Sequence, residues 1–518
     1  MLVRICQLLA AANALLHTAE AAAQPTVKLP TGATISGLVD TNRVGKLVNK
    51  YLGIPFTDAP TGDKRWKQST VKTLTEDLNA TAYGDVCHGN PALDAASGQF
   101  PNNEDCLYLN VYTPAGVTST SKLPVMVWVY GGGFIAGAGN VYDGGSLIGA
   151  SGQKVIVVNF NYRLGALGFF SNEEILAEGD GANFGLRDQE TAFLWVKKYI
   201  SAFGGNPDDI TAFGESAGAI SLAHQLLARD GKQKLFHKAI LQSGGFTSVQ
   251  GTASKAVQAQ QSATLAAAVG CSRPAEGSVL DCLRKVPART IFNATQSFNN
   301  FPVIDKVFVP EAPFLSLLKG KFSRVPTIIG ANTDDGWFLS FGGAKASQFD
   351  AFIRQTHSLM TDAERNDAVF MCAGEIFSDL ISATVPDTYR YRFNYPSSEF
   401  GLPLVLHAKD LDYVFDRKYN LPNNTDAGTV VGHFQKFWTN FAISGSPNGV
   451  AVGNADATQQ ESEGRPVWPR YNVVEKKQII LQPTLAVEAD SAYMPGHSER
   501  CKFWYDVETR LVGDSDGY

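Results

Sequence analysis

A serine between two glycines is the part of this sequence best suited to chemistry. Residues 210–227 read ITAFGESAGAISLAHQLL, in which Gly-x-Ser-x-Gly joins a short apolar run to an apolar helical pattern. A serine on such a strand-to-helix turn exposes its hydroxyl at the edge of a sheet, and Gly214 and Gly218 avoid collisions across the turn. We therefore expect Ser216 to be a catalytic nucleophile, with an ordinary turn serine as the alternative.

The same pentapeptide pattern occurs again at Gly513–Gly517. There it lies in a polar tail, with no strand before it and no apolar helix after it. The pattern without its strand and helix is a weak signal. We expect Ser515 to have no catalytic role.

A nucleophilic serine needs a histidine as base and an acid to orient it, in the chain order Ser, acid, His. The histidines that follow the candidate serine and acid are His357, His407, His433 and His497. His407 ends the apolar run 402–406 and has acidic neighbours, so we expect it to be the base rather than a structural histidine. His433 fits an amphipathic helix, where a core or surface role is favoured.

Two adjacent carboxylates follow a predicted strand at 325–330. Asp334 and Asp335 lie just past its carboxyl end, where catalytic loops are found in sheets of this kind. A carboxylate there can accept the second imidazole N–H and fix its tautomer. The alternative is a simple Asp-Gly turn. Of the two residues, the sequence favours Asp335 as the acid.

Three consecutive glycines after another predicted strand can supply backbone donors. Because Gly131, Gly132 and Gly133 carry no side chains, their N–H groups can converge on one oxygen. Together with the N–H of Ala217, those of Gly132 and Gly133 predict a three-donor oxyanion hole. A phosphate-binding loop is the competing interpretation, but no Lys-Ser or Lys-Thr follows.

Buried strands that alternate with helices must position these residues. Apolar runs bounded by turn residues predict strands at 124–130, 155–159, 210–213, 239–243 and 325–330. Helical patterns at 188–200 and 217–227 lie between them, which predicts a doubly wound, mostly parallel α/β sheet. The polar, helical stretch from 253 to about 300 is expected to be an insertion over the carboxyl edge of the sheet.

The composition is that of a large globular enzyme. The 518 residues are 44% hydrophobic and 18% charged, with a formal net charge of −6. An acidic chain without a basic stripe does not favour binding to nucleic acid or to an anionic membrane, so a small-molecule substrate is expected. We expect one catalytic domain over 24–518.

The amino terminus has the order of a secretory signal peptide. A charged start, an apolar stretch from Ile5 to Leu16 and small residues up to Ala23 predict a signal over 1–23 and an extracellular protein without a membrane anchor. Six cysteines then remain, which supports three disulfides among Cys87, Cys106, Cys271, Cys282, Cys372 and Cys501. Glycosylation sequons begin at Asn79, Asn293 and Asn423.

The chain resembles the type-B carboxylesterase family, which includes cholinesterases and fungal lipases. Besides the serine motif, matching segments are YLGIPFTDAP (51–60), EDCLYLN (104–110), NYRLG (161–165), FGLRDQ (184–189), FGGNP (203–207) and LQSG (241–244). The resemblance implies an α/β-hydrolase fold, the triad Ser216, Asp335 and His407, the oxyanion hole given above, and Ser243 as a hydroxyl near the histidine. It also implies the pairs Cys87–Cys106, Cys271–Cys282 and Cys372–Cys501. Phe298 and Phe301 match a segment that lines the acyl pocket, with Phe298 the better candidate.

The sequence departs from the family at three places. Asp335 stands where Glu is common, so its loop must approach His407 more closely. Tyr130 replaces the more usual His before the glycines, and we expect little effect because backbone groups act there. The segment between Cys87 and Cys106 contains no Trp and is short, which argues against cholinesterase specificity and against a lid.

These observations predict a secreted serine esterase that cleaves carboxylic esters through an acyl-enzyme, without metal or organic cofactor. A lipase acting on long acyl chains is the nearest alternative. A non-catalytic adhesion or binding protein of the same family is another, but such relatives usually lack the serine or the histidine, and Ser216 and His407 are both present.

Overall fold

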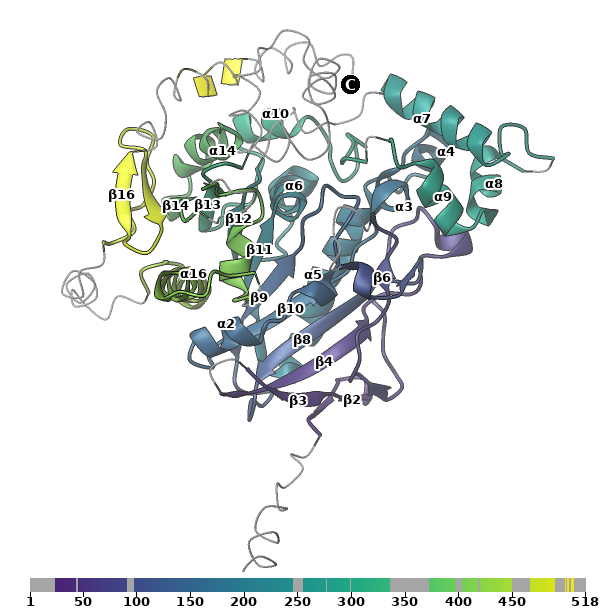
Figure 1. The fold of residues 1–518 in the computed structure, drawn as a ribbon. Helices are drawn as coiled ribbons and strands as arrows, with labels where there is room; N and C mark the ends of the chain where they lie inside the picture. The colour runs from purple at the N-terminus through teal and green to yellow at the C-terminus, as the bar shows by residue number, and fades with distance from the viewer. Residues whose placement is uncertain are drawn as a thin grey trace, which may run out of the picture.

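The computed structural model of the chain describes residues 24–42, 45–90, 97–245, 255–275, 277–298, 300–335, 372–396, 403–417, 420–449, 466–489, 499, 501–502 and 505–506. At its centre is an 11-stranded sheet (Figure 1). In sheet order its strands are β16 (Ala486–Ala489), β15 (Lys477–Leu481), β14 (Thr388–Phe393), β13 (Thr327–Asn332), β12 (Lys238–Gln242), β11 (Gly205–Glu215), β9 (Leu123–Val129), β10 (Ile156–Phe160), β8 (Tyr108–Pro114), β4 (Leu47–Pro55) and β3 (Leu38–Thr41). Smaller sheets join β1 (Thr26–Lys28), β2 (Thr34–Ser36) and β5 (Leu78–Asn79), and β6 (Val86–Cys87) with β7 (Asn102–Asn103).

The central strands run parallel, and their register brings the functional loops together. Neighbouring strands from β15 to β10 are parallel, and antiparallel pairs extend the sheet at both ends. Val129 pairs with Gly214, Glu215 with Gln242, and Gln242 with Gly330. The chain therefore leaves β9, β11, β12 and β13 at one edge, at neighbouring positions, as expected for the carboxyl ends of a parallel sheet.

Helices cover both faces of this sheet. The α-helices of the described residues are α2 (Gly145–Ala150), α3 (Gly165–Phe169), α4 (Glu173–Ala177), α5 (Phe184–Tyr199), α6 (Ala217–Gly231), α7 (Lys255–Ala268), α8 (Val279–Lys285), α9 (Ala288–Ala294), α10 (Pro313–Leu318), α14 (Ala373–Ser382), α15 (Asp410–Val414) and α16 (Thr425–Ser444). Helix α6 packs with α5 and α10, while α16 packs with α2 and α15. Both α6 and α16 contact β9, whose residues 125–129 are all buried, so the two groups cover opposite faces.

The insertion forms a helical lobe at one end of the sheet. Figure 1 shows α7, α8 and α9 gathered beside α4. Helix α9 packs against α3, which begins shortly after β10 ends. The lobe therefore lies toward the carboxyl end of that strand, as the sequence predicts. It has its own apolar cluster, in which Trp66, Leu283 and Ile291 are buried.

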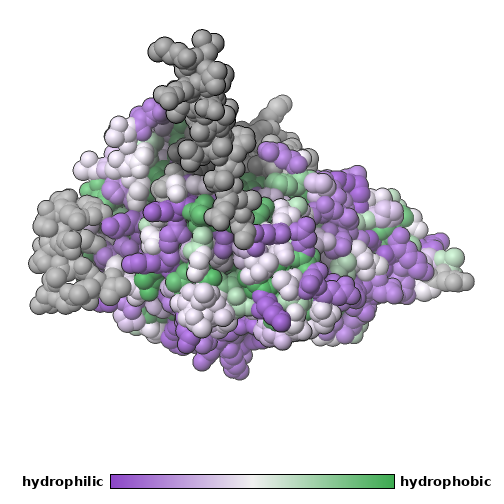
Figure 2. Space-filling model, turned by 90° about the horizontal axis from the view of Figure 1, so that it is seen from below, coloured by the Kyte–Doolittle hydropathy of each residue, from purple (hydrophilic) through white to green (hydrophobic). Residues whose placement is uncertain are grey.

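Three disulfides tie the chain together, in the pairs Cys87–Cys106, Cys271–Cys282 and Cys372–Cys501. They match the pairs that the family resemblance implies. Among the described residues, no helix has the length and apolarity needed to cross a membrane. On the face shown in Figure 2, hydrophobic residues appear as separate patches among hydrophilic ones.

Candidate active site

Ser216 occupies the turn between β11 and α6 in a strained backbone conformation. Its φ of 54° and ψ of −124° lie in a region that residues with a side chain rarely adopt. The turn is held because the Ser216 N–H donates to the carbonyl of Gln242 (2.9 Å) on β12, and Ile220 N–H donates to the Ser216 carbonyl (2.9 Å). Such strain persists only where the surroundings enforce it, and it is characteristic of functional turns.

Strand β9 passes so close to this turn that only glycine fits at the two glycine positions of the motif. A Cβ added to Gly218 would lie 2.0 Å from the carbonyl oxygen of Val129, and one added to Gly214 would lie 2.8 Å from the same atom. Both contacts are with backbone, which cannot rotate away. Any larger residue at Gly218 must therefore displace β9 or the helix, as the motif predicts.

The glycine loop after β9 lies directly against the serine. A Cβ on Gly131 would be 2.9 Å from Cβ of Ser216 and 2.6 Å from the carbonyl oxygen of Glu215. Gly132 (φ 108°) and Gly133 (φ 61°) then turn the chain in the region that favours glycine. No described residue accepts a hydrogen bond from the N–H of Gly132, Gly133 or Ala217, so all three donors remain available to a ligand oxygen.

Asp335 contacts His407, and two further donors bind its carboxylate. Its Oδ1 lies 2.8 Å from Nδ1 of His407, and its Oδ2 accepts from the Ser243 hydroxyl (2.7 Å) and the Asn332 N–H (2.7 Å). Asp335 is 1% exposed. The sequence predicted the Asp335, His407 and Ser243 set, and the fold brings all three side chains together.

Asp334, the competing acid, has a different role. Its Oδ2 accepts from the Val405 N–H at 2.8 Å, and its own N–H donates to the Val405 carbonyl at 3.0 Å. These bonds attach the segment that carries His407 to the end of β13. Asp334 therefore holds the histidine's backbone, whereas Asp335 contacts the ring.

Glu215 lies on the other side of the imidazole and was not predicted from the sequence. Its Oε1 is 3.2 Å from Nε2 of His407. Burial raises the pKa of Glu215 to about 8. Burial alone lowers the pKa of His407, but the carboxylates of Glu215 and Asp335 outweigh it and raise the pKa to about 9. The two groups are close enough to titrate as a pair.

A buried polar network beside the candidate triad was also not predicted from the sequence. The carboxylate of Asp410 accepts from Nε2 of Gln242 (2.7 Å), the Tyr391 hydroxyl (3.3 Å) and Nδ2 of Asn332 (3.4 Å). Nε1 of Trp438 donates to Oε1 of Gln242 at 3.0 Å. Asn332 thus connects Asp410 to the triad acid through its backbone N–H. Burial raises the pKa of Asp410 to about 6.

The two phenylalanines expected to line the acyl pocket belong to different environments. The ring of Phe301 lies 5.5 Å from that of Phe134, which directly follows Gly133, and Phe134 also packs on Phe169. Phe298 is partly buried against the apolar cluster of the helical lobe. Phe301 is therefore the one that borders the glycine loop, and it becomes the better candidate.

A polar cavity of about 370 Å³ adjoins the histidine. Its lining includes His407, Ala408, Lys409, Asp412 and Asn420. Nζ of Lys409 lies 3.1 Å from Oδ2 of Asp412, so the wall of the cavity carries both charges.

The other histidines contribute nothing to this site within the described part of the chain. His433 lies on α16, where its Nε2 is 3.2 Å from the carbonyl of Pro483, in agreement with a structural role. His357, His497 and Ser515 lie outside the described residues.

The sheet is mostly parallel, and along the chain a glycine loop is followed by a nucleophile elbow, an acid and a histidine. This arrangement defines the α/β-hydrolase class, which confirms the predicted fold. The model of the Carboxylesterase family matches residues 23–364 and 346–504, and the chain belongs to that family.

Proteins of similar sequence or structure support the same assignment. The chain is 32% identical to the para-nitrobenzyl esterase of Bacillus subtilis (strain 168), covering 86% of this chain and 93% of the relative. It is 32% identical to mouse (Mus musculus) cholinesterase, covering 91% of this chain and 86% of the relative. The solved structure of Aspergillus niger EstA superimposes with a TM-score of 0.80 at 26% identity, covering 95% of this chain and 99% of that structure's chain. These are carboxylic ester hydrolases, and the predicted enzyme class is confirmed.

Proposed function

We propose that this chain is a secreted serine carboxylesterase that works through an acyl-enzyme on Ser216. The observation that carries the proposal is the orientation of His407. Asp335 binds its Nδ1 at 2.8 Å, while its Nε2 faces Glu215, the residue next to Ser216. In this proposal, an imidazole held in this way exchanges protons with the hydroxyl of Ser216.

In the proposed reaction, His407 removes the hydroxyl proton of Ser216 as that oxygen attacks the ester carbonyl carbon. The N–H groups of Gly132, Gly133 and Ala217 stabilise the negative charge that develops on the carbonyl oxygen. His407 then gives its proton to the departing alcohol, which leaves the acyl group on the serine. Water activated by the same histidine releases the acid and restores the enzyme. These residues supply every step, so the reaction needs neither metal nor organic cofactor.

Asp335 and Ser243 support the base in this proposal. The Asp335 carboxylate fixes the tautomer of His407 and stabilises the imidazolium that forms, and the Ser243 hydroxyl holds that carboxylate at 2.7 Å. Asp is one methylene shorter than the Glu common in the family. The bonds between Asp334 and Val405 support a close approach, because they attach the histidine segment to the end of β13.

The sequence and the site favour an esterase over the alternatives. The segment between Cys87 and Cys106 is short, so nothing there resembles a long lipase lid. A non-catalytic member of the family would have no reason to keep Ser216 in a strained turn beside three backbone donors that bond to no described residue.

Secretion and processing form a second part of the proposal. We propose that residues 1–23 are a signal peptide and that 24–518 is one catalytic domain. Three disulfides are typical of an oxidising compartment. The sequon residues Asn79, Asn293 and Asn423 are all exposed, which makes them suitable glycosylation sites.

Ser216→Ala tests the chemistry. We expect it to reduce kcat for p-nitrophenyl butyrate by on the order of 10⁶ and to abolish covalent labelling by a fluorophosphonate probe, while thermal unfolding stays close to that of the wild type. Ser515→Ala is the matched control and should change neither measurement. More than a few per cent of residual activity in Ser216→Ala would contradict the proposal.

A further inference from the structure

Both ends of the glycine loop are bound to one short segment of the chain. Residues 131–133 are flanked by Tyr130 and Phe134. The Tyr162 hydroxyl donates to the carbonyl of Tyr130 at 3.0 Å, and the Gly165 N–H donates to the carbonyl of Phe134 at 2.7 Å. We call residues 162–165 the clamp segment. The three glycines themselves have no side chains with which to fix their conformation.

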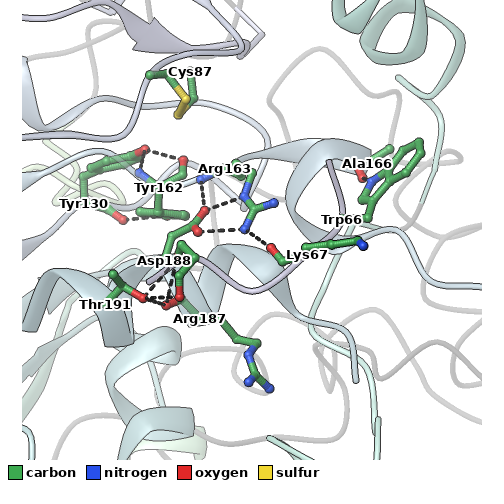
Figure 3. Close-up of polar contacts among 12 residues, drawn as sticks. Trp66, Lys67, Cys87, Tyr130, Tyr162, Arg163, Ala166, Arg187, Asp188 and Thr191 are labelled. Carbon is green, nitrogen blue, oxygen red and sulfur yellow. Dashed lines mark hydrogen bonds and ion pairs between the residues drawn. A yellow bond between two sulfur atoms is a disulfide. The ribbon is translucent and has the colours of Figure 1, made fainter. Parts of the chain in front are cut away.

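The contact between the two tyrosines is reciprocal. The Tyr130 hydroxyl accepts from the Tyr162 N–H (3.2 Å) and donates to the Tyr162 carbonyl (3.1 Å), so each phenol binds the other residue's backbone. The rings stack with centroids 4.4 Å apart and an angle of 19° between their planes. Figure 3 shows the two rings and their dashed contacts. Both residues are fully buried, so water cannot replace a lost bond.

The clamp segment is itself attached to helix α5. Nε and the backbone N–H of Arg163 donate to Oδ2 of Asp188 at 2.7 and 3.1 Å, and its Nη2 donates to Oδ1 at 2.8 Å. The same Nη2 donates to the carbonyl of Lys67 (2.9 Å), and Nε1 of Trp66 donates to the carbonyl of Ala166 (2.8 Å). Asp188 is fully buried, and a bidentate pair of this kind fixes orientation as well as distance.

We propose that the clamp segment is the device that positions the oxyanion loop, with the Tyr162 and Tyr130 hydroxyls as its positioning groups. This inference rests on the proposed function. Oxyanion donors act only if they are held where the charge develops. The clamp supplies that fixation from Asp188 through Arg163 to the loop. It also gives Tyr130 a role beyond the small effect that the sequence suggests.

Tyr162→Phe is the direct test, because it removes one hydroxyl and keeps the ring. We expect kcat for p-nitrophenyl butyrate to fall by about 10- to 100-fold with KM nearly unchanged, since a displaced donor affects the transition state and not the bound ester. A trifluoromethyl ketone, which forms a tetrahedral oxyanion on the serine, should lose affinity by a similar factor. Tyr130→Phe should produce the same pattern.

Tyr112→Phe is the matched control. Tyr112 is also fully buried in the central sheet, and its hydroxyl is bonded to that of Tyr83 at 3.0 Å. The control variant loses a buried phenol bond without touching the glycine loop. It should lower the melting temperature and leave kcat, KM and inhibitor affinity unchanged.

The inference is overturned if Tyr162→Phe and Tyr130→Phe, like the control Tyr112→Phe, change the melting temperature but not kcat or inhibitor affinity. It is also overturned if they raise KM and leave kcat as it was. An inactive wild-type chain would overturn the proposed function together with this inference, whereas an active wild type with equally active clamp variants would overturn this inference alone. If Tyr162→Phe does not fold, Tyr130→Phe alone decides between these outcomes.

Discussion

Oδ1 of Asp335 lies 2.8 Å from Nδ1 of His407, while the neighbouring Asp334 accepts from the backbone of Val405. Asp335→Asn should therefore lower kcat by roughly 10⁴, because the amide favours the wrong imidazole tautomer. Asp334→Asn keeps an oxygen that can accept from Val405, so its kcat should fall far less. Steady-state kinetics on a p-nitrophenyl ester compare the two. Reversed effects would assign the acid to Asp334, and equal effects would contradict the assignment to Asp335.

The pH dependence of the reaction should be shifted to the alkaline side. His407 must be neutral to act as a base, and the carboxylates beside it raise its pKa to about 9. The active form therefore accumulates as the pH rises toward that value, and kcat/KM should increase with it. A profile that is already flat above neutral pH would show that the pKa of His407 is not raised.

Glu215→Gln tests the origin of that shift. The substitution removes a negative charge 3.2 Å from Nε2 of His407, so the pKa of the histidine should fall and the rise in kcat/KM should move to lower pH. Exposed Glu173, which lies on α4, offers a control, since Glu173→Gln should leave the profile in place. If the pH profile of Glu215→Gln does not move, Glu215 does not raise the pKa of the catalytic base.

Acyl-chain preference should depend on Phe301. Its ring packs on Phe134 beside the glycine loop, so Phe301→Ala should open the pocket and move the optimum toward longer or bulkier acyl groups. Each additional buried methylene contributes up to about 0.8 kcal/mol until the pocket is full. Phe298→Ala, in the helical lobe, should lower the melting temperature without changing the profile. Rates on p-nitrophenyl esters of increasing length measure the acyl-chain profile of both variants. A shifted profile in Phe298→Ala alone would favour Phe298 as the pocket residue, as the sequence predicts.

Choline esters should be poor substrates despite the relationship to a cholinesterase. The segment between Cys87 and Cys106 has no Trp. A cationic alcohol would therefore meet no tryptophan face from that segment. We expect kcat/KM for butyrylcholine to be below that for its uncharged analogue, 3,3-dimethylbutyl butyrate. A preference for the choline ester would contradict the prediction.

The strands that the sequence predicts are those made of apolar side chains. The run at 124–130 corresponds to β9 and the run at 239–243 to β12, within a residue or two. Strand β14 was missed because its sequence, TYRYRF, includes Arg390 and Arg392, which are buried through tertiary contacts that a hydrophobicity pattern cannot register. Strand β8 was missed for a similar reason, since Asn110 is fully buried there.

The candidate site also contains residues that the sequence predicts and residues that it does not. Ser216 and the glycine loop were identified because their motifs are continuous in the chain and dictated by local backbone geometry. The choice between Asp334 and Asp335 depends on which carboxylate faces a segment about 70 residues later, which only the folded chain determines. Glu215 and Asp410 could have been flagged, since one precedes Ser216 and the other lies three residues after His407.

The arrangement of the sheet has a consequence for engineering this protein. The candidate nucleophile, the glycine loop and the candidate acid follow β11, β9 and β13, parallel strands of one sheet between which only β12 intervenes, whereas Phe298 and Phe301 follow helix α9 of the inserted lobe. Libraries confined to the segment that carries Phe301 should alter which esters are accepted while the candidate reacting groups keep their spacing. Randomising the strand ends would alter both at once, so that segment is the part of the chain to diversify.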